Sequence, residues 1–275
     1  LKPCGEVRED GQSSQCRVAI TQVMDAGGYI PAFIVNSIVP STLNVVNSAR
    51  VAFNRDEEID LKDRKDLLHI MEDADSSYGG GEDTGETIES AKAKFSSIED
   101  LKPLESTSQH VTVKGGFIEG DPLGIGFGEV IVDCRIEECA ANEFMSYSRG
   151  ALEMFYGRGG GMLREFKHYS SHCLRNRSVY HAPPGFSPRE LLWEVAWRRT
   201  DPSTIVMAFV PVNPDDVPLN KEYVRAESWT FVEFTRIVNA DGFQQTKITY
   251  KTQVDMHGHI PISIINSQLA SRLMF

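Results

Sequence analysis

The chain contains one stretch of sequence twice. Residues 25–37 (DAGGYIPAFIVNS) return at residues 255–267 as DMHGHIPISIINS, with seven of the thirteen positions identical. The two copies lie 230 residues apart, which is too long for a solenoid or propeller repeat and close to the length of one domain plus a linker. The chain is therefore predicted to hold the end of one domain and, later, a second copy that runs to the same ending.

Each copy has the same local pattern of strand, tight turn and closing helix. Apolar and polar residues alternate at period two over residues 16–23 and 246–254, and each run stops at an Asp and a Gly. Pro31 and Pro261 follow, where the fixed φ of proline suits the first turn of a helix. Apolar residues after each proline are spaced for one helical face. We therefore expect closing helices over residues 32–46 and 262–275.

Three motifs of the second copy agree, in the same order, with one family. Residues 187–199 contain Arg189, Glu190 and a hydrophobic strand that ends in Trp-Arg-Arg, and residues 223–229 open a strand with Val-Arg-Ala-Glu. With the strand–turn–helix ending, they resemble START lipid-transfer domains, although Glu190 stands where the family has Asp. The resemblance covers roughly residues 120–275 as one nearly complete domain and residues 12–53 as the tail of another.

The resemblance implies a fold of the α+β class, the helix-grip fold, in which a curved antiparallel sheet is packed on a C-terminal helix. Strand periodicity from residue 110 onward agrees with this class. We expect three parts. Residues 1–55 are the C-terminal end of a first START-like domain, residues 56–109 are an acidic and largely disordered linker, and residues 110–275 are a second START-like domain.

The acidity of the chain is concentrated in the expected linker. The net charge is −11, and sixteen Asp and Glu against six Lys and Arg between Asp56 and Glu105 account for −10 of it (6 − 16). Residues 76–85 are polar and rich in glycine, which favours a disordered tether with short helices near residues 61–72 and 88–101. We interpret this segment as a solvated spacer. The alternative is a regulated acidic segment that repels anionic membranes or recruits a basic partner.

Patterns that suggest catalysis or metal binding fail on their spacing. The glycines of residues 124–128 lead into a strand, so no phosphate would meet a helix N-terminus there. His168 and His172 would lie about 13 Å apart on one strand, too far for a single ion. His257 and His259 lack further ligands, and no nucleophile elbow or Walker loop is present. We therefore expect no catalytic residue, no metal, no cofactor and no nucleic-acid partner.

Cysteine usage and hydropathy indicate the setting of the protein. Five cysteines, an odd number without framework spacing, favour reduced thiols and a cytoplasmic location. No stretch approaches the roughly 18 consecutive apolar residues of a membrane span.

The resemblance implies an apolar cavity between the sheet and the closing helix. Alternate residues of 193–197 share one face of a strand, residues 229 and 231 share one face of another, and the closing helix adds its apolar side. Glu165 matches a position where some START domains orient a polar lipid head, but the usual arginine partner falls at Val195, so no sterol-type salt bridge is expected. The candidate ligand-binding residues are Glu165, Trp193, Val195, Trp197, Trp229, Phe231, Ile264, Ile265 and Leu269.

The expected function is non-enzymatic binding of a hydrophobic ligand, a lipid, for transfer or sensing. Arg189 is expected to secure a strand entrance rather than to touch the ligand, and the loop containing Val217 and Leu219 to cap the cavity mouth and contact a membrane transiently. Two alternatives remain open. A helix-grip enzyme of the cyclase or hydrolase type would need two or more polar residues converging in the cavity, and a ligand-free interaction module would use the acidic segment to recruit partners.

Overall fold

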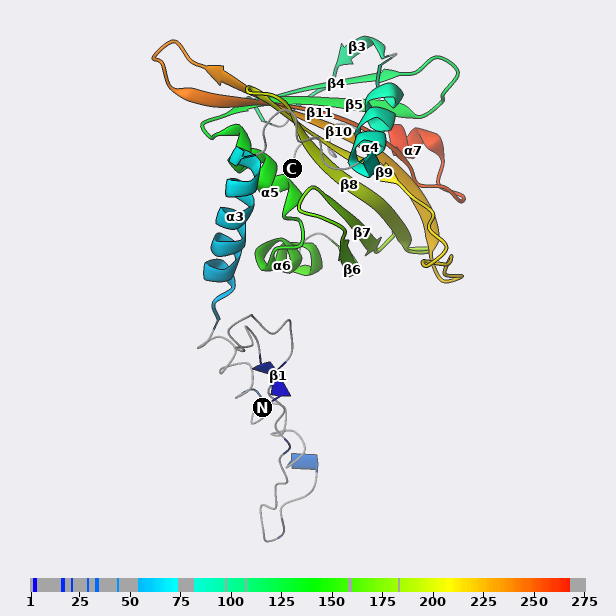
Figure 1. Ribbon diagram of the computed structural model, residues 1–275. Helices are drawn as coiled ribbons and strands as arrows, with labels where there is room; N and C mark the ends of the chain where they lie inside the picture. Colours follow the sequence, from blue (N-terminus) through cyan, green and yellow to red (C-terminus); the bar gives the residue numbers. More distant parts are fainter. Residues whose placement is uncertain are drawn as a thin grey trace. The chain divides into compact units, whose positions relative to one another are not determined.

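The computed structural model describes residues 54–73, 82–96, 98–106, 108–157, 160–182 and 184–267, together with a few isolated positions before residue 54 (Figure 1). The chain divides into two units, Leu1–Asp56 and Glu57–Phe275. In the first unit, β1 (Lys2–Pro3) and β2 (Cys16–Arg17) pair antiparallel. Most of the strand and helix expected there lie outside the described residues, so the tandem-domain hypothesis stays a prediction.

The second unit is built on a nine-stranded sheet with the order β3-β4-β5-β11-β10-β9-β8-β7-β6. Neighbours in this order pair antiparallel, and β10 adds a short parallel pairing with β8 at Val224–Ala226. The strands are β3 (Glu99–Pro103), β4 (Val111–Phe117), β5 (Gly124–Val132), β6 (Gly161–His168), β7 (Cys173–Tyr180), β8 (Arg189–Asp201), β9 (Thr204–Pro211), β10 (Val224–Val238) and β11 (Gln244–Asp255).

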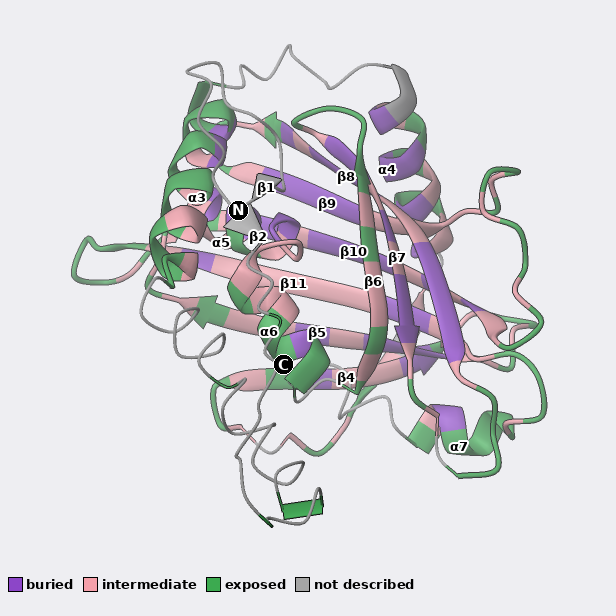
Figure 2. Ribbon diagram, turned by 90° about the horizontal axis from the view of Figure 1, so that it is seen from below, coloured by how far each residue is buried: buried purple, intermediate pink, exposed green. Residues whose placement is uncertain are grey.

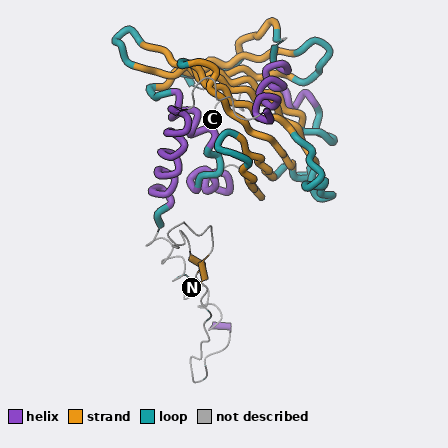
Figure 3. The backbone as a smooth tube through the Cα atoms, viewed as in Figure 1, coloured by secondary structure: helices purple, strands orange, loops and turns teal. Residues whose placement is uncertain are grey.

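Helices cover both faces of this sheet. The helices are α3 (Asp56–Asp73), α4 (Glu82–Lys94), α5 (Ile136–Phe144), α6 (Arg149–Gly157) and α7 (Ile262–Ser267). The sheet curves around α5 and α6 (Figure 1), and the tube view shows these helices and α3 on one side of it (Figure 3). The α+β helix-grip class predicted from the sequence is confirmed. None of the described helices combines the length and the low polarity needed to cross a bilayer.

Two apolar clusters define the faces of the sheet. On the inner face, Leu67 and Met71 of α3 and the apolar side of α5 pack against Val195 and Trp197. On the outer face, α4 packs against the small residues that alternate with them, such as Ala196. Because both faces are covered, strand β8 is buried along most of its length and β9 is buried at residues 205–208 (Figure 2).

The segment expected to be a disordered linker differs from that expectation. Residues 56–109 contain α3, α4 and β3, and the compact unit already begins at Glu57. Ile88, Ala91 and Phe95 recur at helical spacing and are all buried against the sheet. The acidic residues occupy the remaining surface of these helices. The short helices expected near residues 61–72 and 88–101 overlap α3 and α4, but composition did not show that they pack on the sheet, because a short apolar stripe is stabilised only once the sheet covers it.

The repeated motif forms the turn and helix that its sequence predicts. The Asp255 Oδ1 accepts the backbone N–H of His257 (2.8 Å), and His257 and Gly258 adopt positive φ angles of 47° and 67°. Helix α7 follows Pro261 directly. The side chain of Asn266 ties it to the start of β5, since its Oδ1 accepts the Gly124 N–H (2.9 Å) and its Nδ2 donates to the Pro122 carbonyl (3.2 Å). The predicted helix beyond Ser267, including Leu269, lies outside the described residues.

Candidate functional site

The predicted pocket residues do not share one face of the sheet. Trp193, Val195 and Trp197 of β8 project from the inner face and belong to, or pack against, the cluster under α3 and α5. Trp229 and Phe231 of β10 project from the outer face and belong to the cluster under α4. The prediction that all five line one cavity is wrong.

The pairing register explains this error. Val195 lies opposite Phe209, and Phe209 lies opposite Thr230. Because paired residues of neighbouring strands point to the same face, the inner-face residue of β10 is Thr230, and Trp229 on its flank points outward. Of the closing helix, Ile265 is buried, whereas Ile264 is 52% exposed.

Glu165 belongs to an ion network on the outer face. Its Oε2 lies 2.8 Å from Nη1 of Arg177, and Arg177 also binds Glu190 through Nε at 2.7 Å. Glu190, itself buried, holds Arg225 at 2.8 Å as well. Glu165 is 55% exposed at the rim of this network. The expected head-group carboxylate is therefore a surface ion-pair residue in this structure.

The inner face instead carries polar groups that the sequence did not single out. Arg164 directly precedes Glu165 on β6 and lies opposite Ser178, so its side chain leaves the strand on the inner face. Its Nε donates to the Ser178 Oγ at 3.2 Å. Glu143 of α5, Tyr180 of β7 and Tyr250 of β11 complete the group, and each is partly buried.

Electrostatic effects show that these four side chains are neighbours. Burial raises the pKa of Glu143, and the charge of Arg164 partly opposes that shift. Burial and the charge of Glu143 both raise the pKa of Tyr250. Burial lowers the pKa of Arg164, while it raises that of Tyr180 against the effect of the Arg164 charge. Charge thus couples groups that come from β6, β7, β11 and α5.

Glycines lie beside Tyr250 in the register of the sheet. Tyr250 lies opposite Gly128 and Thr252 lies opposite Gly126, and Gly126 in turn faces Gly115 of β4. Gly126 and Gly128 belong to the motif at residues 124–128, which the sequence excluded as a nucleotide loop and which lies within β5. Both glycines are buried, and a Cβ atom at Gly115 would lie 3.0 Å from the Leu104 side chain. Leu104 therefore covers the sheet at Gly115.

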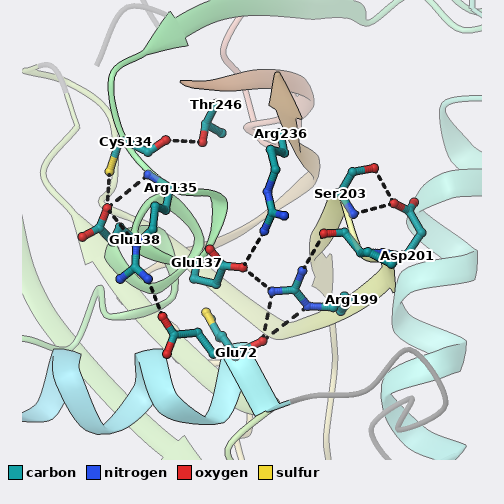
Figure 4. A network of polar contacts seen from close by, with 12 residues as sticks. Glu72, Cys134, Arg135, Glu137, Glu138, Arg199, Asp201, Ser203, Arg236 and Thr246 are labelled. Atoms are coloured by element: carbon teal, nitrogen blue, oxygen red, sulfur yellow. Dashed lines mark hydrogen bonds and ion pairs between the residues drawn. The ribbon is translucent and has the colours of Figure 1, made fainter. Parts of the chain in front are cut away.

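A second polar network closes the end of the inner face near α3 (Figure 4). Glu137 of α5 is buried and pairs with both Arg199 of β8 and Arg236 of β10. Arg199 also donates through Nη2 to the Met71 carbonyl of α3 at 3.1 Å. These contacts join two helices to two strands. Because each partner is engaged, we assign this network a structural role.

The histidines considered for metal binding are dispersed. His168 lies on β6 with its ring 4.6 Å from that of Tyr147, whereas the His172 ring stacks on Trp197 at 4.2 Å. His257 lies in the turn before α7. Among the described residues, no three His, Cys, Asp or Glu side chains are grouped so that they could hold a metal ion.

Comparisons with known proteins identify similar folds among solved structures but no similar sequence family. No family model matches the chain, and no curated protein matches it. Among solved structures, human STARD10 is similar with a TM-score of 0.53 and 16% identity, over 68% of this chain and 75% of that one. Human StAR-related lipid transfer protein 5 is similar with a TM-score of 0.52 and 16% identity, over 69% of this chain and 92% of that one.

A bacterial structure is similar to the chain to about the same extent as the two human structures. The fragment of the STAR-related lipid transfer protein from Xanthomonas axonopodis gives a TM-score of 0.50 and 19% identity, over 64% of this chain and 94% of that one. The described sheet and its helices thus have the START-like fold that the three sequence motifs indicated.

Proposed function

We propose that the second unit binds a lipid or similar hydrophobic ligand on the inner face of the sheet, without chemical conversion, for transfer or sensing. The observation that carries the proposal is a gradient of burial along that face. Near α3 and α5 the apolar side chains are fully buried. Further along, the apolar side chains that pack on the same cluster keep accessible surface: Tyr147, Phe166, Trp193, Phe209, Ile248 and Tyr250.

Burial of this surface by a ligand supplies the affinity. Removing apolar surface from water contributes about 25 cal/mol per Å², so an acyl chain or a ring system that covers these side chains binds without a charged anchor. Lipid-transfer proteins of the same fold support this assignment by analogy.

The loop between β9 and β10 is the proposed site of ligand entry and of transient membrane contact. Leu219 at its tip is 71% exposed. The loop is held from the outer face by Asp216, whose carboxylate receives two hydrogen bonds of 2.7 Å from Arg175. Opening of the loop requires these bonds to break while the inner face stays intact.

An acid–base enzyme is the second candidate, because four polar side chains converge on the inner face. Glu143 with its raised pKa fits a general acid or base, and Tyr250 fits a proton donor. Lipid binding and acid–base catalysis differ in the molecule that the protein releases. A binding protein releases its co-purified ligand unchanged, whereas an enzyme releases a product of different mass after prolonged incubation with that ligand.

Two tryptophans on opposite faces provide a matched test. Trp193 and Trp229 are both partly exposed, and only Trp193 lies on the inner face. We expect Trp193→Ala to reduce the uptake of a fluorescent acyl lipid at least about tenfold, and Trp229→Ala to leave uptake within about twofold. Circular dichroism and thermal melts of both variants control for folding. Equal uptake by the two variants would place the ligand elsewhere.

A further inference from the structure

Arg164 is held in place on the inner face, yet its charge is not neutralised. Its guanidinium carbon lies 4.4 Å from the centre of the Phe155 ring and 5.8 Å from that of Phe166, and its Nε binds Ser178. Among the described residues, neither of its terminal nitrogens makes a hydrogen bond or an ion pair. The stacking and the single hydrogen bond orient the guanidinium group and leave its two-nitrogen edge available.

The nearest acidic neighbour does not neutralise this charge by contact. Glu143 of α5 interacts with Arg164 through its charge, but no hydrogen bond or ion pair joins the two side chains within the part of the chain that the structure describes. Burial raises the pKa of Glu143. Burial also raises the pKa of Tyr250, so its hydroxyl group keeps its proton at neutral pH. Arg164 and the Tyr250 hydroxyl group are therefore two hydrogen-bond donors on this part of the inner face.

The other described arginines on the inner face are already engaged. Arg199 and Arg236 bind Glu137, and Arg189 binds the carbonyl groups of the turn before α7. Among the described arginines that project from the strands onto this face, Arg164 is thus the one whose terminal nitrogens have no hydrogen bond or ion pair; Arg64, whose Nε also lacks a partner, lies on α3. One guanidinium edge matches the two oxygens and the single charge of a carboxylate. A phosphate monoester carries more negative charge than this site compensates.

We propose that Arg164 binds the carboxylate of a long-chain acid, with the acyl chain lying along the inner face toward Tyr250. This inference rests on the proposed function and specifies the ligand class of the same site. It departs from the sequence-based expectation in its residues, because Arg164 takes the role for which Glu165 was considered.

The experiment compares ligands that differ only in the head group. Oleate, oleyl alcohol and oleoyl lysophosphatidate are titrated against the full chain preloaded with Nile red, and displacement gives each affinity. For the native chain we expect oleate to bind at least about tenfold more tightly than oleyl alcohol, the effect of charge-assisted hydrogen bonds to one guanidinium group. Binding of the alcohol or the lysophosphatidate as tightly as oleate overturns the proposal.

Variants test the assigned residues. Arg164→Gln is expected to remove the preference for oleate while it leaves the affinity for oleyl alcohol within about twofold, and Arg164→Lys to restore part of the preference. Glu143→Gln keeps the Arg164 guanidinium group and its contacts and should keep oleate binding within about threefold. Glu165→Gln, the adjacent residue on the outer face, is the control and should bind like the native chain. Persistence of the oleate preference in Arg164→Gln overturns the assignment, provided that its melting curve is native-like.

The displacement experiment distinguishes failure of the head-group assignment from failure of the proposed function. If oleyl alcohol displaces Nile red as well as oleate does, the inner face binds hydrophobic ligands and only the head-group assignment is wrong. If no compound displaces Nile red from the native chain and no lipid co-purifies with it, the proposed function fails together with the inference.

Discussion

The guanidinium group of Arg189 donates through Nε to the backbone carbonyl of Met256 at 2.8 Å. The same side chain reaches the carbonyl groups of His257 (3.2 Å) and Ser187. Arg189 is 2% exposed, and burial lowers its pKa. The first residue of β8 thus holds the turn that introduces α7. This arrangement agrees with the structural role expected of Arg189.

Removal of Arg189 should therefore destabilise the fold. We expect Arg189→Ala to lower the free energy of unfolding by about 3 kcal/mol, because it removes a buried guanidinium group that donates to three backbone carbonyl groups. Urea denaturation measures this loss. Arg198→Ala removes the partly exposed pair with Glu89 and should cost less than about 1 kcal/mol. Similar costs for the two variants would show that Arg189 is not the anchor of this turn.

The buried network at Glu137 should be as important for stability as the turn. Glu137→Ala leaves Arg199 buried without its carboxylate and is expected to cost about 3–5 kcal/mol. Glu72→Ala removes the more exposed pair with Arg135 and should cost about 1 kcal/mol or less. In a double-mutant cycle, Glu137→Ala combined with Arg199→Ala should cost less than the sum of the single changes. Additive costs would contradict a direct interaction.

Glu143 should make stability depend on pH in a defined direction. Burial raises its pKa in the folded state above the ordinary value of 4.5, so between these two values the folded state binds more protons than the unfolded state. Its contribution is fully present below pH 4.5 and is lost as the pH rises through the raised pKa. We therefore expect the stability of Glu143→Gln, relative to the native chain, to increase as the pH rises from 4.5 to 8.

Urea denaturation of both proteins across this pH range measures the effect. The two chains share every other titrating group, so the difference between their free energies of unfolding isolates Glu143. A difference that stays constant, or that decreases with pH, would show that Glu143 is not desolvated in the folded state.

Two truncations test where the second unit begins. Deletion of residues 1–55 should change the melting temperature by only a few degrees, because α3 remains. Deletion of residues 1–73 removes Leu67 and Met71 from the core, the Met71 carbonyl that Arg199 binds, and the Asp60 carboxylate that accepts the N–H groups of Arg149 and Gly150 at 2.9 Å. We expect a fall of about 10 °C or more.

Calorimetry of the two truncated proteins distinguishes the possibilities. Equal melting temperatures of the two truncated proteins would show that α3 is not part of the folded unit. Helix α3 would then belong to the linker, as the sequence-based domain boundary at residue 110 predicts. A large loss in the shorter deletion would show that residues 1–55 and the second unit unfold cooperatively.

Interactions between residues close in the sequence allowed some turns and helix starts of this protein to be predicted. An Asp that binds the backbone two residues on, a Gly at positive φ and a Pro before a helix act within a few residues, so the turn at Asp255–Gly258 and the start of α7 followed from the motif alone. The alternation along each strand likewise showed which residues share a face. The three motifs then indicated the START-like fold.

The tertiary structure decided which residues of neighbouring strands lie on the same face of the sheet. A strand's own pattern cannot reveal how it aligns with its neighbour, and a shift of one residue exchanges the two faces. Register therefore separated Trp229 from Trp193 and placed Arg164, rather than Glu165, on the inner face. Helix α4 depends on the same kind of information, because the sheet that covers Ile88 and Phe95 comes from residues far along the chain. The local signals determined the elements and the turns, whereas long-range pairing determined the site.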